Sequence, residues 1–268
     1  FFKMMFFLNH NSDFINFAAV LGGLKAGQSH AQDILPASTM FAVSLNISGL
    51  KGYLKDYQKY LDANKKLSGR MAEADRIQLP DAPSPLEWVS NEGFTEFVSA
   101  FCLVGNKYEW VTFLYKNSTS FFGKLTGIKG KGQRMAPEPF PFKGYLANLL
   151  GEAFSHNPET SFCKTGDWTV IGSAPVVEEF FNGRANAVNL DKYLSHTPAS
   201  SFFSEKGVAK ALVNIKEGSD TVFTVLNKYY RKRFEASTAK KNFEYATLNI
   251  APRSQGTAAT MTFYAALL

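Results

Sequence analysis

The sequence predicts an α+β fold made of two related lobes, because one short phrase recurs along the chain. The phrase is AVSLNI at 42–47, KALVNI at 210–215 and YATLNI at 245–250. Each of the first two copies precedes a helix-like stretch and then two strand-like runs, which indicates an internally duplicated strand-helix-strand-strand unit. Since each helix follows one strand and precedes a hairpin, we expect mainly antiparallel sheets with the helices packed on one face.

Residues 1–34 are predicted to form an N-terminal helical segment. The stretch FFKMMFFLNH is strongly apolar, and Gly22 and Gly23 are placed to end a helix. The apolar runs are too short to predict a membrane-spanning helix, which needs about 18 or more apolar residues. The pattern favours a buried or docking helix over a helix that lies on a membrane surface.

Residues 35–184 are assigned to the first lobe. A strand is predicted over Met40–Ile47, and apolar side chains at helical spacing then predict an amphipathic helix to residue 66. Two further strands are expected at Phe94–Val104 and Tyr108–Tyr115, joined by a Gly-Asn-Lys hairpin turn.

The first lobe also carries an insert. Residues 67–92 and 126–143 are rich in proline or glycine and are predicted to be loops, the second of them flexible. The structured parts expected here are helices at 117–125, 144–154 and 174–181, and a hairpin over 160–172.

Residues 185–268 are assigned to the second lobe. After a short helix at 190–194, the expected elements repeat the order of the first lobe. They are a strand over 208–215, a helix over 219–232, and strands over 243–250 and 257–267.

The chain is mildly basic and rich in phenylalanine. Its formal net charge is +6, and it contains 25 Phe but 3 Trp, so many rings must pack into small cores or coat contact surfaces. The clustered cations are Arg231, Lys232, Arg233, Lys240 and Lys241. We interpret them as a solvated helix end, with an anionic partner as the alternative, and we expect no nucleic-acid partner.

The histidines and cysteines do not form a metal pattern. The four histidines are dispersed without ligand spacing, so no metal site is expected. Cys102 and Cys163 are predicted to be free buried thiols, with one disulfide left open as the alternative.

The remaining catalytic candidates lack the features that their chemistry requires. Residues 127–134 (GIKGKGQR) lack the GK[ST] of a phosphate loop, which favours a mobile loop. Cys163 and His156 are conceivable as nucleophile and base, yet no sequence feature activates the thiol. Glu178 and Glu179 are adjacent on a helix and point in different directions. We therefore predict a non-enzymatic protein with no catalytic, cofactor-binding or metal-binding residues and no cofactor.

Asn46 and Asn214 occupy the same position in the two repeats, at the end of a strand before a helix. We interpret both as satisfying backbone groups at the helix entry rather than as ligand contacts. The tyrosines that follow these strands are interpreted as helix core with wet hydroxyls rather than as a ligand box. They are Tyr53, Tyr57, Tyr60, Tyr229 and Tyr230.

Two segments carry a family resemblance. They are LPASTMFAVSLNISGLKGYL at 35–54 and GDWTVIGSAPVVEEFFNG at 166–183. On these segments the chain resembles repeat-containing bacterial cell-envelope proteins of a domain-of-unknown-function family, in Bacteroidetes and elsewhere. The resemblance covers residues 35–268, while residues 1–34 match nothing in it and no lipobox cysteine is present. It implies export, lipid anchoring as a lipoprotein or periplasmic residence, and a binding or assembly role.

We therefore expect a non-enzymatic protein of the bacterial cell envelope, periplasmic or associated with the outer membrane. It would be a structural or accessory subunit of an outer-membrane-associated complex, with other envelope proteins as partners. Aromatic surface and hairpin edges would supply the contacts, and association with a membrane surface is compatible with this role. The alternative is a periplasmic binder of an apolar small molecule or lipid, held in a cavity between the lobes.

Overall fold

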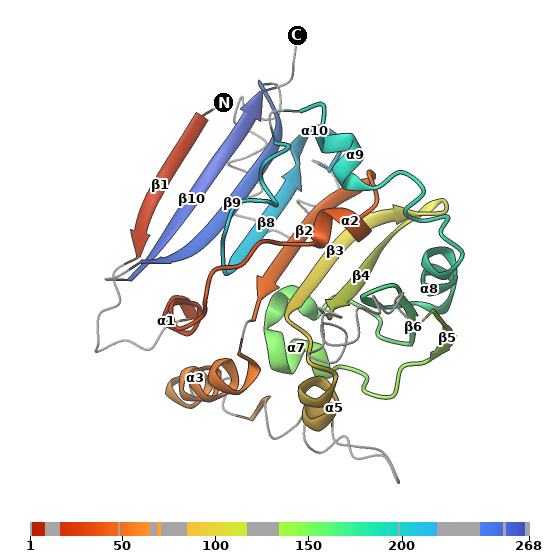
Figure 1. The fold of residues 1–268 in the computed structure, drawn as a ribbon, viewed down its shortest axis with the longest axis horizontal. Helices are drawn as coiled ribbons and strands as arrows, with labels where there is room; N and C mark the ends of the chain where they lie inside the picture. The colour runs from red at the N-terminus through yellow and green to blue at the C-terminus, as the bar shows by residue number, and fades with distance from the viewer. Residues whose placement is uncertain are drawn as a thin grey trace, which may run out of the picture.

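The computed structural model describes residues 2–8, 17–47, 49–64, 69–70, 85–116, 134–197, 199–218, 242–253 and 256–265. Its strands are β1 (Phe2–Leu8), β2 (Thr39–Asn46), β3 (Glu96–Val104), β4 (Lys107–Tyr115), β5 (Met135–Pro139), β6 (Ser161–Thr165), β7 (Trp168–Gly172), β8 (Ala209–Asn214), β9 (Phe243–Arg253) and β10 (Gly256–Ala265). They form one antiparallel sheet in the order β1-β10-β9-β8-β2-β3-β4-β7-β6-β5 (Figure 1). The predicted α+β class and its antiparallel pairing are therefore confirmed.

The helices are α1 (Phe17–Gly22), α2 (Ala31–Ile34), α3 (Leu50–Ala63), α5 (Pro85–Glu92), α7 (Tyr145–Leu150), α8 (Ala174–Phe181), α9 (Leu190–Leu194) and α10 (Ile215–Gly218). A 3-10 turn, η1 (Glu152–Phe154), follows α7 after Gly151. The helices predicted at 174–181 and 190–194 coincide with α8 and α9. Those predicted at 117–125 and 219–232 lie outside the described residues.

Strands β2 and β8, which carry the first two copies of the recurring phrase, pair with each other at the centre of the sheet (Figure 1). Val43 lies opposite Ala211, and these are the same position in AVSLNI and KALVNI. An internal duplication with a two-fold axis through this pair would produce this register, and the duplication stays a prediction. Strands β2-β3-β4 and β8-β9-β10 belong to one sheet, and the lobe boundaries assigned from the sequence also stay predictions.

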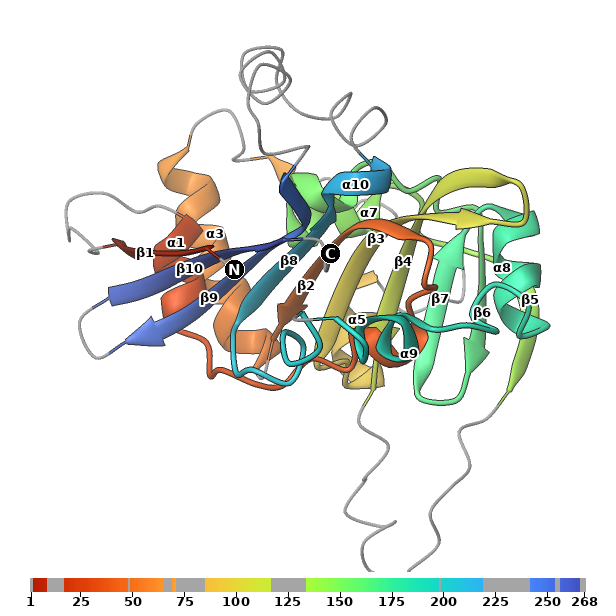
Figure 2. The same cartoon turned by 90° about the horizontal axis from the view of Figure 1, so that it is seen from above.

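Helices cover both faces of this sheet, whereas the sequence led us to expect them on one. One side, here called the α3 face, carries Phe97 and Leu114 and is covered by α1, α3, α5 and α7. The other, the α8 face, carries Val98 and Phe113 and is covered by α2, α8 and α9. In Figure 2, α7 and α9 lie on opposite sides of the central strands. The reason is that the strands are apolar on both faces, and segments outside the predicted strand-helix-strand-strand unit supply the second cover.

The N-terminal segment, where helix was predicted, begins instead with an edge strand. Residues 2–8 pair with β10, and Met4 lies opposite Met261. Lys3 and Met5 are exposed while Met4 between them is half-buried, which is the alternation of a strand. An apolar run of this length is compatible with either structure, and the available edge of β10 decides the outcome. The later parts of the segment are helical, as α1 and α2.

Two further elements arise within segments predicted as loops. Helix α5 begins at Pro85, which suits the first turn of a helix, and it buries Val89 completely. Strand β5 pairs with β6 at the edge of the sheet and contains Pro137 and Pro139. Proline is tolerated on an edge strand because its missing N–H is not needed by a neighbour. The proline content that indicated loops is thus compatible with both elements.

Candidate functional site

Both cysteines are free and buried in the core on the α8 face, as predicted. Burial raises the pKa of Cys102 to about 12 and that of Cys163 to about 11, so both thiols stay protonated near neutral pH. His156 lies on the opposite face, where its ring centre is 5.0 Å from that of Trp110. The structure therefore does not bring Cys163 and His156 together as nucleophile and base.

Asn46 bonds across the sheet rather than at the entry of its own helix. Its Nδ2 donates to the backbone oxygen of Gly207 at 3.3 Å, and its backbone N–H donates to the oxygen of Val208 at 2.8 Å. The prediction of a backbone-bonding role is confirmed for this residue, but its partner differs because the end of β2 lies beside the start of β8. Asn214 is likewise buried.

The carboxylates of α8 do not act as a pair. Glu179 forms an ion pair with Arg184, with 2.6 Å between Oε1 and Nη2, whereas Glu178 is exposed. Arg134, at the end of the glycine-rich run, donates to the backbone oxygen of Phe181, and its guanidinium carbon lies 4.5 Å from the centre of that ring. The remainder of that run and the clustered cations near the predicted second-lobe helix lie outside the described residues.

A buried polar cluster surrounds Glu96, which sequence analysis did not single out. Its carboxylate accepts hydrogen bonds from the hydroxyls of Ser29 and Ser44 and from the backbone N–H of His30 at 2.8 Å. Burial raises the pKa of Glu96, and these three donors oppose the rise. The imidazole of His30 stacks on Tyr115 at 4.3 Å instead of contacting either serine. The cluster therefore fastens the start of α2 to the sheet.

Lys210 forms a second buried polar tie. Its Nζ donates to the backbone oxygens of Phe202 at 3.1 Å, Phe203 at 2.6 Å and Glu205. Burial lowers the pKa of this ammonium to about 8, while nearby Glu96 and Glu205 favour its charged form. All three acceptors belong to the turn that leads into β8, so the residue holds that turn on the sheet.

The described residues contain neither a metal-ligand cluster nor a membrane-spanning helix. No group of three or more His, Cys, Asp or Glu side chains gathers there in a way that could hold a metal ion. Within the same residues, no helix is long and apolar enough to cross a membrane.

A cavity of about 430 Å³ lies on the α3 face, between α1, α3 and η1. Its lining is mainly aromatic and aliphatic, and we call it the aromatic cavity. It is lined by Phe17, Val43, Leu45, Tyr57, Tyr60, Arg70, Leu150, Gly151 and Ala153.

The spacing of residues on α3 builds one wall of the aromatic cavity. Tyr53, Tyr57 and Leu61 recur every four residues and are buried, as the amphipathic pattern predicts. Tyr60 stands beside this row, with its ring centre 6.0 Å from that of Tyr57. Phe17 from α1 meets both rings edge-on, at 6.1 Å from Tyr57 and 5.7 Å from Tyr60. Edge-on and stacked rings at these distances attract one another, so the three form a preorganised wall.

Strand β2 supplies the floor through Val43 and Leu45. The two residues that lie opposite Val43 on its neighbouring strands are small, namely Ala211 on β8 and Ser99 on β3. Side chains opposite each other on adjacent strands share one face, so small neighbours leave room above the floor.

The far wall is formed where α7 ends. Leu150 is the last residue of the helix, and Gly151 follows with a φ of 95°, a conformation that favours glycine. This break redirects the chain so that Ala153 of η1 faces the cavity with a single methyl group. The predicted helix over 144–154 is therefore interrupted at the point where the cavity needs a small side chain.

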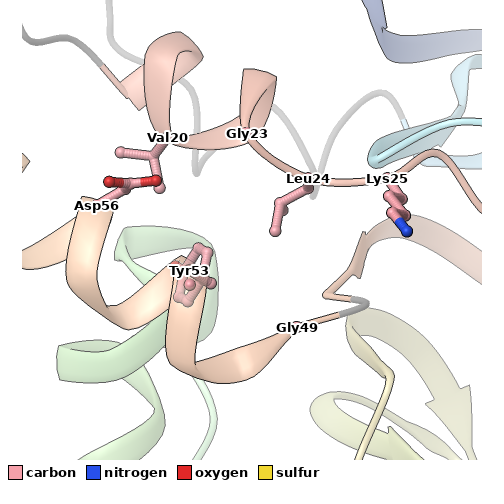
Figure 3. Close-up of a pocket in the computed structure, with 8 residues that line it drawn as sticks. Val20, Gly23, Leu24, Lys25, Gly49, Tyr53 and Asp56 are labelled. Carbon is pink, nitrogen blue, oxygen red and sulfur yellow. The ribbon is translucent and has the colours of Figure 1, made fainter.

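A smaller pocket of about 260 Å³ lies between the end of α1 and the start of α3 (Figure 3). Leu24 and Tyr53 point into it, and Asp56 and Lys25 lie at opposite ends. Asp56 forms an ion pair with Lys59 at 2.9 Å. The volume of this smaller pocket is below the range of about 300–1,000 Å³ that is usual for ligand pockets. The aromatic cavity is therefore the stronger candidate site.

Sequence reasoning named two of the cavity residues but gave them another role. Tyr57 and Tyr60 were interpreted as helix core, and Tyr57 is indeed buried. The lining comes from five separate parts of the chain, so no local pattern reveals it. The sequence signal for this wall is the row of tyrosines at helical spacing. That pattern does not by itself distinguish residues of a helix core from residues that line a ligand cavity. Tyr229 and Tyr230 lie outside the described residues.

Comparisons with known proteins do not identify a function for this site. No protein-family model matches the chain, and no curated protein matches it. Among solved structures, crystal form III of TP0453 is 10% identical, with a TM-score of 0.34, and the match covers 89% of this chain and 81% of that one. Crystal form IV of TP0453 is 9% identical, with a TM-score of 0.33 and coverages of 84% and 76%. Likeness at this level carries no argument about function.

Proposed function

We propose that the protein binds an apolar small molecule in the aromatic cavity. The observation that carries the proposal is the cavity itself, whose volume of about 430 Å³ falls within the usual range for ligand pockets. Its walls are rings and aliphatic side chains on a β-strand floor. Such a lining favours a flexible hydrocarbon chain or a ring system over a polar metabolite.

The energetics set a condition on the ligand. Burying about ten methylenes contributes about 8 kcal/mol, against an association cost of about 4–15 kcal/mol. Measurable affinity therefore requires most of a medium-length chain to be enclosed. The rings of Phe17, Tyr57 and Tyr60 already pack against one another, which limits the ordering that binding must impose on the wall.

The test measures binding of a neutral apolar fluorophore, N-phenyl-1-naphthylamine, and its displacement by 1-dodecanol. Ala153→Leu adds three carbons inside the cavity. If it displaces about three methylenes of ligand, the loss is about 2.4 kcal/mol, or about 50-fold in affinity. Ala174→Leu, at an exposed position on α8, is the matched control and should leave binding unchanged.

Thermal unfolding of both variants shows whether each remains folded. Saturable binding by the wild type, lost in Ala153→Leu and kept in Ala174→Leu, supports the proposal. Absence of binding in the folded wild-type protein contradicts it, as does equal binding by both variants.

A second candidate function is the accessory subunit expected from the sequence. What favours it is a row of partly or largely exposed rings near the β3–β4 hairpin, formed by Phe41, Phe101, Tyr108 and Trp110. Ring centres along the row lie 5.9 Å apart for Phe41–Trp110, 5.2 Å for Phe101–Trp110 and 5.6 Å for Phe101–Tyr108. Tyr108 is 39% exposed. Aromatic side chains are enriched at protein interfaces.

A photoreactive amino acid at position 108 tests this second function in the cells that make the protein. A discrete crosslinked envelope protein, absent when the photoreactive group is at exposed position 188 instead, supports an accessory role. Crosslinking no different from that at position 188 contradicts it.

A further inference from the structure

We propose that the ligand of the aromatic cavity is an anionic amphiphile whose charged head is held by Arg70, an inference that rests on the proposed function and narrows it. The ligand would carry one carboxylate or phosphate group on an apolar chain. The head would lie at the Arg70 side of the cavity, and the chain would lie over Val43 and Leu45.

The placement of Arg70 motivates the proposal. Among the described residues that line the aromatic cavity, it alone is charged. It is half-buried, and it enters the cavity wall a few residues beyond the end of α3. A purely apolar ligand would gain nothing from a guanidinium here, whereas an acid would gain a charge-assisted hydrogen bond.

Arginine has the capacity for this contact. Its guanidinium carries five N–H donors in a planar fork that matches carboxylate and phosphate oxygens. Arg70 already takes part in an interaction within the protein, so the ligand head would bind alongside that interaction. The low polarity of the surrounding rings strengthens any remaining bond to an anion, since water screens it less.

The acids of the neighbouring helix are engaged with other partners. On α3, Asp56 forms an ion pair with Lys59 at 2.9 Å, and Asp62 accepts a hydrogen bond from Gln58 at 2.6 Å. No carboxylate is among the described lining residues. The lining therefore favours an anionic head over a cationic or zwitterionic one.

The experiment compares three ligands with the same twelve-carbon chain, namely dodecanoate, dodecyl phosphate and 1-dodecanol. Each displaces N-phenyl-1-naphthylamine from the intact protein at pH 8, where the carboxylic acid is ionised. We expect at least one of the two anions to bind about tenfold more tightly than the alcohol, an advantage that shrinks at high salt. Which anion binds more tightly distinguishes a fatty-acid-like ligand from a phosphate-headed one.

Arg70→Gln keeps a polar side chain with an N–H donor, but it shortens the side chain and removes its charge. It should weaken binding of the preferred anion about tenfold and change binding of 1-dodecanol less than twofold. Lys59→Gln is the matched control, because it removes a charge from exposed α3 without lining the cavity, and it should change neither.

The outcomes distinguish failure of the anionic-head inference from failure of the proposed apolar-ligand binding. If 1-dodecanol binds as tightly as both anions, or if Arg70→Gln weakens all three ligands alike, the anionic head is wrong and apolar binding stands. If none of the three displaces the fluorophore, and the fluorophore itself does not bind, the proposed function fails.

Discussion

Two buried serines on adjacent central strands should respond in opposite ways when their hydroxyl groups are removed. Ser44 on β2 is 1% exposed and donates to Glu96 Oε1 at 2.5 Å. Ser99 on β3 is fully buried, and its hydroxyl has no hydrogen-bond partner among the described residues. The two sites match in residue type and burial and lie on opposite faces of the same sheet, and they differ in whether the hydroxyl is hydrogen-bonded.

The structure sets the expected magnitudes. Ser44→Ala removes a hydrogen bond to a carboxylate and should lower the free energy of unfolding by about 1.5–3 kcal/mol. Ser99→Ala removes an unpaired hydroxyl whose burial costs about 1–3 kcal/mol, offset by the small void that is left. We expect this second variant to range from neutral to about 1 kcal/mol more stable than the wild type.

Urea unfolding followed by tryptophan fluorescence and circular dichroism measures both changes against the wild type. For a chain of this size, about 1 kcal/mol corresponds to about 2–4 °C in Tm, so the two variants should be clearly separated by thermal melts as well. Equal destabilisation by the two substitutions would refute the reasoning, since it would mean that the hydroxyl of Ser99 is hydrogen-bonded or that the bond of Ser44 to Glu96 contributes nothing.

Three further predictions concern burial and backbone conformation. Burial raises the pKa of Glu159 to about 7 from 4.5, so the native state holds a proton that the unfolded chain releases, and stability falls as pH rises between these values. The free energy of unfolding of Glu159→Gln, measured with urea, should fall less between pH 5 and 8 than that of the wild type, by up to about 3 kcal/mol. Parallel pH profiles of the variant and the wild type would contradict this. Cys102 and Cys163 should react with a thiol reagent only after unfolding, and fast reaction of the native protein would count against their burial. Gly52→Ala, at an exposed position within α3, should stabilise the protein by about 0.5–1 kcal/mol. Gly144→Ala, at a φ of 76°, should destabilise it by about 1–2 kcal/mol. The opposite order of Tm values in thermal melts would be incompatible with these backbone conformations.

Local chemistry explains what the sequence predicted well. Helix α8 has a proline in its first turn and Gly183, with a φ of 71°, just beyond its end, so both boundaries follow from single residues. The turn between β6 and β7 contains Gly166 with a φ of 63° and Asp167, which are residues that favour a tight hairpin. Both cysteines lie on strands, and their predicted burial as free thiols is confirmed.

Tertiary contacts explain what the sequence could not give. Strand β1 is an apolar run whose structure is decided by the edge of β10, which is more than 240 residues away in the chain. The helices on the α8 face come from outside the predicted strand-helix-strand-strand unit, so that pattern alone does not predict them. The aromatic cavity joins Phe17 of α1 to Ala153 of η1, and such convergence has no signature at any fixed spacing. For the same reason the partners of Glu96 and Lys210 were not predicted.

Locating a bound ligand tests the central claim most directly. Co-crystallisation with 12-bromododecanoate, followed by anomalous diffraction at the bromine edge, reports where the end of the chain lies. We predict one bromine peak within the aromatic cavity, close to Val43 and Tyr57, and no such peak in Ala153→Leu crystals grown under the same conditions. A bromine site elsewhere on the protein at saturating ligand, with the cavity empty, would contradict the account.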